Sequence, residues 1–231
     1  MPTLTPDEWQ ALALSLKVSF WATALSLPVG LLTALVLARG TFRGKSILNG
    51  LVHLPLILPP VVTGYLLLLT FGRRGPVGAF LDANFGIVFS FRWTGAALAA
   101  AVMAFPLMVR AIRLSIEAVD ARLEDAAGTL GANRLWTFVI VTLPLILPGV
   151  IAGAILGFAK AMGEFGATIT FVSSIPGETR TLPAAIYGYT QVPGGQPQAM
   201  RLTLIAVAVA MTALIASEFV ARRVARRIRD G

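Results

Sequence analysis

The chain is dominated by apolar runs that are each long enough to form a helix across a lipid bilayer. A helix needs about 20 residues to cross the hydrocarbon core, where every backbone polar group has to be satisfied within the protein. Five such runs can be delimited: Leu12–Leu37, Ile47–Phe71, Thr94–Val109, Leu145–Phe165 and Leu202–Phe219. The third is short, and we expect its helix to continue through Arg110 and Arg113. The sequence therefore predicts an all-α polytopic membrane protein, with residues 1–231 forming a single transmembrane domain.

Residues 167–200, between the fourth and fifth runs, leave a sixth crossing open. The segment contains several apolar residues, but it also contains Pro176, Pro183, Pro193, Pro197 and the pair Gly194-Gly195. Proline and glycine interrupt helices. We expect an external loop with a short helix near Leu182–Tyr189, and a re-entrant course is the alternative.

Basic residues set the expected orientation, because Lys and Arg accumulate in cytoplasmic loops. One side of the membrane carries the segments after the first, third and fifth runs, with Arg39, Arg43, Lys45, Arg110, Arg113, Arg122, Arg134, Arg222, Arg223, Arg226, Arg227 and Arg229. The other side carries fewer basic residues: Arg73, Arg74, Arg92, Arg180 and Arg201. We therefore expect the N-terminus outside and the C-terminus in the cytoplasm.

The composition argues against several other classes of protein. The chain has no cysteine and a single histidine, His53, so we expect neither a disulfide framework nor a metal site. The net charge of +8 raises the question of nucleic acid, but the basic residues flank apolar runs, where they orient a membrane protein. We expect contact with membrane lipid and none with nucleic acid. Ala22-Thr23-Ala24 looks like a signal-peptide cleavage site, but the start of the chain is acidic, so we expect a retained first helix.

Prolines interrupt the second apolar run. Pro55, Pro59 and Pro60 remove backbone donors from the middle of this run. Broken backbone at membrane depth is tolerated where it is buried in protein or lines a water-filled cavity. Pro59 and Pro60 are therefore candidates for a pore or gate, and a simple kink is the alternative.

The polar segment 117–144 predicts two helices joined by a glycine turn. Leu123, Ala126, Ala127 and Leu130 fall at i, i+3, i+4 and i+7, which is one face of a helix. Glu124 and Asp125 lie early in this helix if it starts near Asp120, where carboxylates complement the helix dipole. Gly131 suits a left-handed C-cap, and Asn133 suits the N-cap of a second helix. From spacing alone, an amphipathic helix resting on the membrane surface explains the pattern equally well.

The same segment resembles the cytoplasmic signature loop of bacterial ABC importer permeases. The family pattern is Glu-Ala-Ala, three residues, Gly, nine residues, Ile, one residue and Leu-Pro. Here the matching positions are Asp125, Ala126, Ala127, Gly131, Val141, Leu143 and Pro144, with two conservative departures at Asp125 and Val141. The resemblance implies a type I importer fold and a coupling helix that docks on an ATPase subunit. It assigns the docking to Glu124, Asp125, Ala126, Ala127, Leu130 and Gly131.

Further segments sharpen the resemblance to the molybdate permease subunit. They are His53–Leu68, Gly72–Gly78, Phe105–Arg113 and Gly163–Pro183. Sulfate and thiosulfate permeases look similar around Gly163–Ala167 and Ile175–Gly177, and they are the alternative. The resemblance implies import of molybdate, with tungstate left open, across the bacterial inner membrane.

Several polar and small residues are candidates for the pore or gate. Gly149, Gly153 and Gly157 form a small-residue ladder, which indicates a close helix crossing either between subunits or within one. Glu164 lies near the outer end of the fourth run, and Lys160 one turn earlier is its expected partner. Thr168 and Thr170 offer hydroxyls beyond it, which either line an anion path or belong to a solvated loop end.

The chain has no ATP-binding motif of its own. Residues 40–46 end like a phosphate-binding loop, but three residues separate its glycines where the motif needs four. We therefore expect no enzyme activity and no bound cofactor, with ATP and Mg²⁺ on a partner. The resemblance implies an ATPase dimer, a second copy of this chain and a periplasmic or lipid-anchored molybdate-binding protein as partners.

Two other classes of protein fit the sequence less well. A membrane-embedded enzyme would need intramembrane carboxylates, and Glu164 and Glu218 lie in different runs without forming a recognisable site. A self-sufficient secondary transporter is disfavoured because five spans are too few for two internal repeats.

Overall fold

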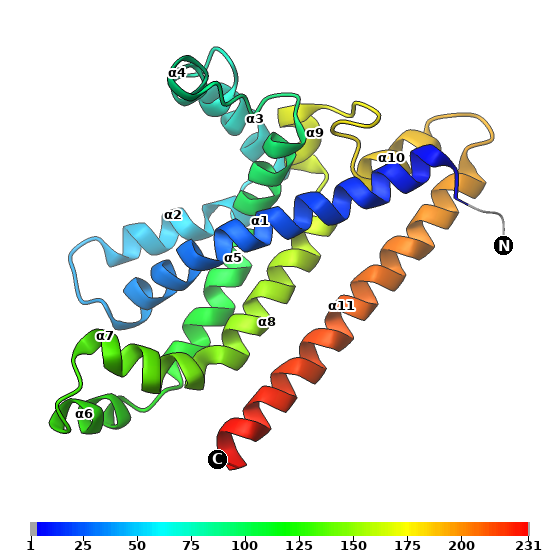
Figure 1. The fold of residues 1–231 in the computed structure, drawn as a ribbon. Coiled ribbons are helices and arrows are strands. Elements are labelled where there is room, and N and C mark those ends of the chain that lie inside the picture. Colours follow the sequence, from blue (N-terminus) through cyan, green and yellow to red (C-terminus); the bar gives the residue numbers. More distant parts are fainter. Residues whose placement is uncertain (1–3, 231) are drawn as a thin grey trace.

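The structure is a computed structural model that describes residues 4–230, and this part of the chain contains helices and no strand. The helices are α1 (Pro6–Arg39), α2 (Lys45–Ile57), α3 (Pro60–Phe71), α4 (Pro76–Phe85), α5 (Trp93–Glu117), α6 (Ala121–Thr129), α7 (Arg134–Thr137), the π-helical turn η1 (Phe138–Thr142), α8 (Leu143–Met162), α9 (Gly166–Val172), α10 (Leu182–Thr190) and α11 (Gln196–Asp230). Figure 1 shows α6 and α7 at one end of the molecule and α4 at the other.

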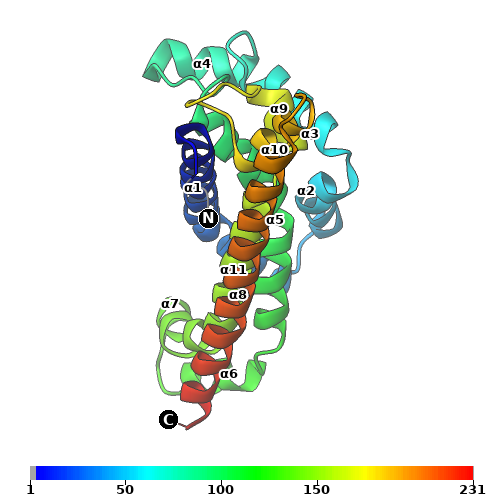
Figure 2. The same cartoon turned by 90° about the vertical axis from the view of Figure 1, so that its right-hand side faces the viewer.

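Helix α5 is the centre of the bundle and packs between α1 and α8 (Figures 1 and 2). At the end nearer α6, the three helices share an apolar cluster that includes Leu37 of α1, Ile116 of α5 and Ile146 of α8, each fully buried. A second cluster lies at the other end, where Ala96 and Ala100 of α5 meet Phe171 of α9. The buried face of α5 is therefore continuous along the helix.

Glycines allow the close approach of these helices. A Cβ at Gly157 of α8 would lie 2.7 Å from Met108 Cε, and a Cβ at Gly30 of α1 would lie 3.1 Å from Met108 Sδ. Met108 of α5 is thus held between the two neighbouring helices. A Cβ at Gly149 would overlap Ser115 of α5. Small residues at such contacts let helix backbones approach closely in a membrane.

The expected spans are largely confirmed, with one exception. Within the described residues, four helical segments are long and apolar enough to cross a membrane: Pro6–Arg39, Trp93–Glu117, Arg134–Met162 and Gln196–Ala216. The third expected span does continue through Arg113, because α5 ends at Glu117. The second was expected as one interrupted helix over Ile47–Phe71, and it is two helices, α2 and α3, bent by 114°. The bend follows from Pro59 and Pro60, which have no N–H to continue the ladder of α2.

The connections at the end opposite α6 contain more helix than expected. The predicted short helix near Leu182–Tyr189 is confirmed as α10. Helix α8 ends at Met162, within a few residues of the expected end of the fourth span, and helix α9, which was not predicted, begins at Gly166. Helix α4 was not predicted either. It starts at Pro76 and ends at Phe85, before Gly86, which has a left-handed φ of 65°.

The N-terminus of α1 is fixed by a capping box and by a distant ion pair. Glu8 N donates to Thr5 Oγ1 at 3.3 Å, and Thr5 N donates to Glu8 Oε2 at 2.7 Å. The carboxylate of Glu8 is fully buried and accepts from Arg201 Nη2 of α11 at 2.8 Å. This pair joins the first helix to the last one at the end opposite α6.

Gly149→Ala tests the close packing of α8 on α5. The added methyl group would overlap Ser115, so we expect a loss of about 1–3 kcal/mol in stability, seen as a lower unfolding temperature of the purified protein. Gly188→Ala is the matched control, because no atom lies within 4 Å of the Cβ it would add in α10. An unchanged unfolding temperature for Gly149→Ala would contradict this packing.

Candidate functional site

The segment from Asp120 to Thr137 has the local structure that the sequence predicts. Asp120 is the N-cap of α6, and its carboxylate accepts from Arg122 N at 2.9 Å. Helix α6 ends at Thr129, and Gly131 has a left-handed φ of 88°. Asn133 then caps α7, with its side-chain oxygen accepting from Trp136 N at 2.8 Å. The two helices are therefore joined by a turn that favours glycine at its centre.

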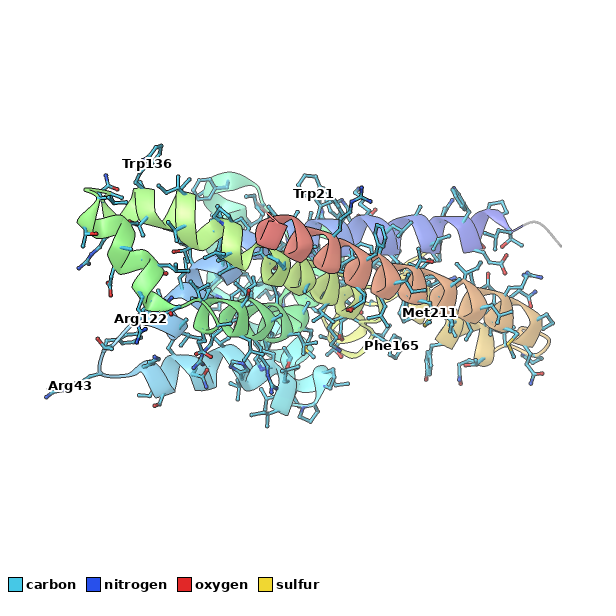
Figure 3. All side chains as sticks on the ribbon, turned by 90° about the horizontal axis from the view of Figure 1, so that it is seen from below. Trp21, Arg43, Arg122, Trp136, Phe165 and Met211 are labelled. Carbon is cyan, nitrogen blue, oxygen red and sulfur yellow. The ribbon has the colours of Figure 1, made fainter. Side chains whose placement is uncertain are left out.

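This helical turn exposes an apolar surface. No residue of α6 is buried, and Leu130 is 89% exposed. Leu135 and Trp136 follow at 72% and 59% exposure, and Figure 3 shows Trp136 pointing away from the bundle. We call Leu130, Leu135 and Trp136 the docking patch. Large exposed apolar residues grouped on a polar segment indicate a protein-binding surface.

The predicted docking residues do not all face the same way. Asp125, Ala126 and Gly131 are exposed, and Ala127 is half-buried. The side chain of Glu124 instead turns to its own chain. Its Oε1 accepts from Arg39 Nη2 at 3.1 Å and from Thr142 Oγ1 at 2.9 Å. No local pattern indicates the contact with Arg39, because 85 positions separate the two residues.

The docking patch lies at the end of the molecule that holds the basic loops. Arg43, in the loop after α1, and Arg122, in α6, both lie at this end in Figure 3. Helix α11 also runs toward this end (Figure 1). The arrangement agrees with the sequence-based expectation that these segments share one side of the membrane.

At the opposite half of the bundle, the structure brings together the break after α2 and the break after α8. A Cβ at Gly166 would lie 2.6 Å from Pro60 Cβ, and a Cβ at Gly64 of α3 would lie 2.5 Å from Ala167 O. Helix α3 therefore packs closely on α9. Of the predicted gate residues, Pro60 and Thr170 lie at this contact, since a Cβ at Gly64 would also lie 2.9 Å from Thr170 Cβ. Thr168 lies in α9, and Pro59 precedes α3 as its N-cap.

Glu164 organises the break between α8 and α9. Its carboxylate is 2% exposed, and its Oε1 accepts from Ala167 N in the first turn of α9 at 2.9 Å. Its Oε2 accepts from Lys160 Nζ at 3.2 Å, which confirms the predicted ion pair. The carboxylate thus caps the helix that follows and neutralises the lysine of the helix that precedes it.

The hydroxyl groups of the gate candidates are occupied within their own helix. Thr168 Oγ1 donates to Phe165 O at 2.9 Å, and Thr170 Oγ1 donates to Gly166 O at 2.8 Å. Gly153 and Gly157 lie elsewhere, against Ile112 and Met108 of α5. Their packing is thus within one subunit, which was one of the two alternatives for the ladder. A gate role for these residues stays a prediction.

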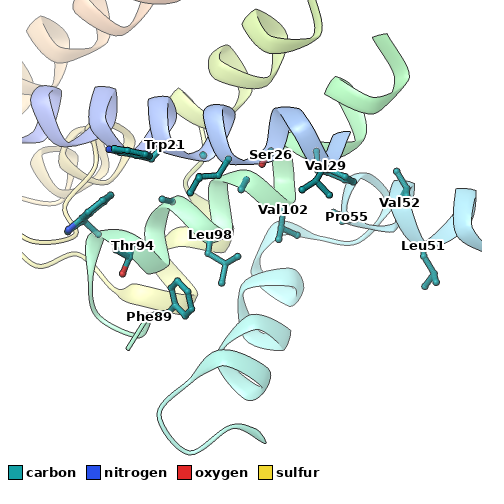
Figure 4. A pocket seen from close by; sticks show the side chains of 16 residues that line it. Trp21, Ser26, Val29, Leu51, Val52, Pro55, Phe89, Thr94, Leu98 and Val102 are labelled. Atoms are coloured by element: carbon teal, nitrogen blue, oxygen red, sulfur yellow. The ribbon is translucent and has the colours of Figure 1, made fainter. Parts of the chain in front are cut away.

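A groove of about 750 Å³ lies between α1, α2 and α5 (Figure 4). Its walls include Trp21, Leu25 and Val29 of α1 and Leu98 and Val102 of α5. Ser26 and Thr94 supply the hydroxyls of this lining, and no lining residue is charged. A desolvated anion would find few donors here, so the groove does not suit an anion path.

Comparisons with known proteins place this geometry in context. The family described as binding-protein-dependent transport system inner membrane component matches residues 26–230. A molybdenum transport system permease protein of Escherichia coli strain K12 is 60% identical over 95% of this chain and 96% of its own length. A protein of the same name from Haemophilus influenzae is 51% identical over 97% of this chain and 98% of its own. A sulfate transport system permease protein of Synechococcus elongatus is 39% identical over 75% of this chain and 60% of its own.

Solved structures show the same fold at low sequence identity. A bacterial ABC transporter that imports the polysaccharide alginate aligns with a TM-score of 0.74 at 16% identity, over 95% of this chain and 80% of that one. A methionine ABC transporter in an inward-facing conformation aligns with a TM-score of 0.69 at 17% identity, over 94% of each chain. The predicted type I importer permease fold is thereby confirmed.

Glu164→Ala tests the buried carboxylate. It leaves the amide of Ala167 without its acceptor and Lys160 without its partner, so we expect a loss of about 1–3 kcal/mol in stability. Glu164→Gln keeps an acceptor for the amide of Ala167, so we expect it to lower the stability less than Glu164→Ala does. Thermal unfolding of the purified variants measures both, with the exposed Glu178→Ala as control. Equal unfolding temperatures for all variants would show that the carboxylate does not hold the break.

Proposed function

Because the chain belongs to the family of binding-protein-dependent transport system inner membrane components, we propose that it forms the membrane pathway of a molybdate importer. It is a multi-pass inner-membrane transport subunit, and we assign no catalytic residue to it. The substrate proposal rests on the two molybdenum permeases, which are 60% and 51% identical to this chain over nearly its full length. Sulfate is the second candidate, supported by a more distant relative at 39% identity.

The proposal that an ATPase docks here rests on one observation, the exposed docking patch on α7 and on the turn after α6. Leu130, Leu135 and Trp136 project from a capped helix–turn–helix that offers them to a partner rather than to the chain's own core. Apolar anchors with aromatic character are typical of protein-binding sites. Asp125 lies in α6, beside the small residues Ala126 and Ala127, which let a partner approach the helix closely. ATP and Mg²⁺ then bind to the ATPase, and this chain needs no cofactor.

A second copy of the chain is the proposed partner within the membrane. Helices α2 and α3 expose a series of large apolar residues, among them Ile57, Val61 and Tyr65. The break between these helices also leaves backbone groups that lipid does not satisfy. A symmetric pair would cover both features and would offer one docking patch to each of two ATPase subunits.

The proposed orientation follows from the positions of the basic loops. The docking patch, Arg39 and Arg43 face the cytoplasm, where an ATPase is available. The N-terminus, α4 and α10 then lie outside, where we propose that a periplasmic or lipid-anchored molybdate-binding protein delivers the anion. Lipid surrounds the remaining apolar surface.

Gly131→Val tests the docking assignment. A β-branched residue at a φ of 88° is strained, so the turn must change and the docking patch must move relative to α6. We expect at least a ten-fold loss of affinity for the ATPase in detergent, and loss of molybdate uptake by reconstituted vesicles.

Gly86→Val is the matched control for this experiment. Gly86 also has a left-handed φ, of 65°, with open space around it, and it lies at the opposite end of the molecule. The control should retain ATPase binding. Normal uptake and normal ATPase binding by Gly131→Val would rule out this turn as the docking element.

Substrate choice is tested by uptake in vesicles that contain this chain, its ATPase and its binding protein. We expect ATP-dependent accumulation of labelled molybdate that a ten-fold excess of sulfate leaves largely intact. Stronger competition by sulfate than by unlabelled molybdate would favour the second candidate.

A further inference from the structure

Helix α6 has few ways to transmit force to the membrane helices. None of its residues is buried, so it has no apolar core contact of its own. It is joined to the chain by the turn after α5 on one side and by the Gly131 turn on the other. The side chain of Glu124 adds contacts to α1 and to η1, as described above.

Three elements meet at Glu124. Arg39, in the last turn of α1, donates from Nη2 to Glu124 Oε1 at 3.1 Å and to Val119 O, before α6, at 3.3 Å. Thr142 is the last residue of η1 and donates from Oγ1 to the same carboxylate oxygen at 2.9 Å. The carboxylate therefore ties α6 to the end of the first helix and to the start of α8.

The contacts of Glu124 with Arg39 and Thr142 lie next to the closely packed part of the bundle. Leu37, two residues before Arg39, is fully buried, and so are Ile116 of α5 and Ile146 of α8 in the same apolar cluster. Met108, held between Gly30 and Gly157, fixes the three helices further along. A displacement applied at Arg39 or Thr142 is thus passed to closely packed helices, which do not deform easily.

The contact of Glu124 with Thr142 also spans an irregular turn of helix. Between α7 and α8 the chain takes a π-helical turn, Phe138–Thr142, and π-helical turns interrupt the regular hydrogen bonding of a helix. Along the chain, α7 connects to α8 through this turn. The bond from Thr142 to Glu124 reaches from α6 to the far end of the turn.

We propose that Arg39, Glu124 and Thr142 form a clamp that makes α6 move as one body with α1 and α8. They are positioning residues, because they transmit the motion of the ATPase to the membrane helices without holding the ATPase themselves. This inference rests on the proposed function, in which α6 docks on the ATPase. It separates Glu124 from Asp125, which is exposed and free to face a partner.

Removing the clamp should leave the chain folded. The side chains of Arg39 and Glu124 are 36% and 26% exposed, and ion pairs that solvent reaches to this extent contribute little to folding. The experiment uses the complete complex in vesicles, with its ATPase and binding protein. Three quantities are measured: affinity for the ATPase, the rate of ATP hydrolysis, and molybdate transported per ATP hydrolysed.

We expect Arg39→Gln, Glu124→Gln and Thr142→Val to bind the ATPase with an affinity within two-fold of that of the unsubstituted protein. Each should lower the amount of molybdate transported per ATP several-fold, with the two variants of the ion pair affected most. The double variant Arg39→Glu with Glu124→Arg restores opposite charges and should recover most of the ratio that either single reversal loses. Asp82→Asn is the control, because it removes the carboxylate of the Arg73 pair at the outer end.

Three results would overturn the clamp. They are an unchanged transport ratio in all three variants, a loss of ATPase affinity that parallels the loss of transport, and a double reversal no better than its single reversals. The second result would make Glu124 a docking contact instead. By contrast, an unchanged protein that binds no ATPase would contradict the proposed function itself.

A distance measurement tests the same clamp independently of activity. The chain has no cysteine, so spin labels at Thr129→Cys in α6 and Val36→Cys in α1 report the separation of these two helices. In the assembled complex we expect a narrow peak for the distance between the two labels of one chain, beside the distances between labels on different copies. Glu124→Gln should broaden the peak from within one chain, and Asp82→Asn should leave it unchanged. A distribution that stays narrow in Glu124→Gln would show that α6 is held without the clamp.

Discussion

The contact of α5 with α1 and α8 is the interaction on which the rest of the structure depends. In a membrane, lipid tails are as apolar as leucine, so helices associate through close packing and hydrogen bonds rather than through the hydrophobic effect. Here the packing is achieved by placing glycines opposite bulky residues, as at Met108 and Ser115. The packing of α8 on α5 therefore sets where α9 begins at one end of α8. At the other end, it sets where η1 and α7 join α8.

Polar contacts at both ends of the bundle hold the segments that this packing does not hold. At the end opposite α6, Glu8 and Arg201 join α1 to α11, and Glu164 holds α9 to the end of α8. At the other end, Glu124 joins α6 to α1 and η1. In each case a carboxylate accepts at least two hydrogen bonds from separate groups, which is how a buried or half-buried charge is stabilised.

Local signals in the sequence predicted local structure well. The helix start near Asp120, the cap at Asn133 and the turn at Gly131 were expected because each depends on residues close to it in the sequence. Helix α4 carried comparable signals, a proline at its first position and a glycine after its last, and these went unused. The contacts of Glu124 with Arg39 and of Glu8 with Arg201 could not be predicted, because they depend on how distant helices pack. The same holds for the bend between α2 and α3, whose prolines predict a break but not its angle.

The break between α2 and α3 has a consequence for where water lies. In a continuous helix, the carbonyls of Pro55 and Leu56 would accept from the amides of residues 59 and 60, but both of these residues are prolines and have no amide hydrogen. Hydrocarbon offers no replacement donor, whereas a hydrated passage does. These two carbonyls without helical donors therefore mark the bend as a point where the membrane part of the chain meets water or another polar group. No charged side chain is needed for this.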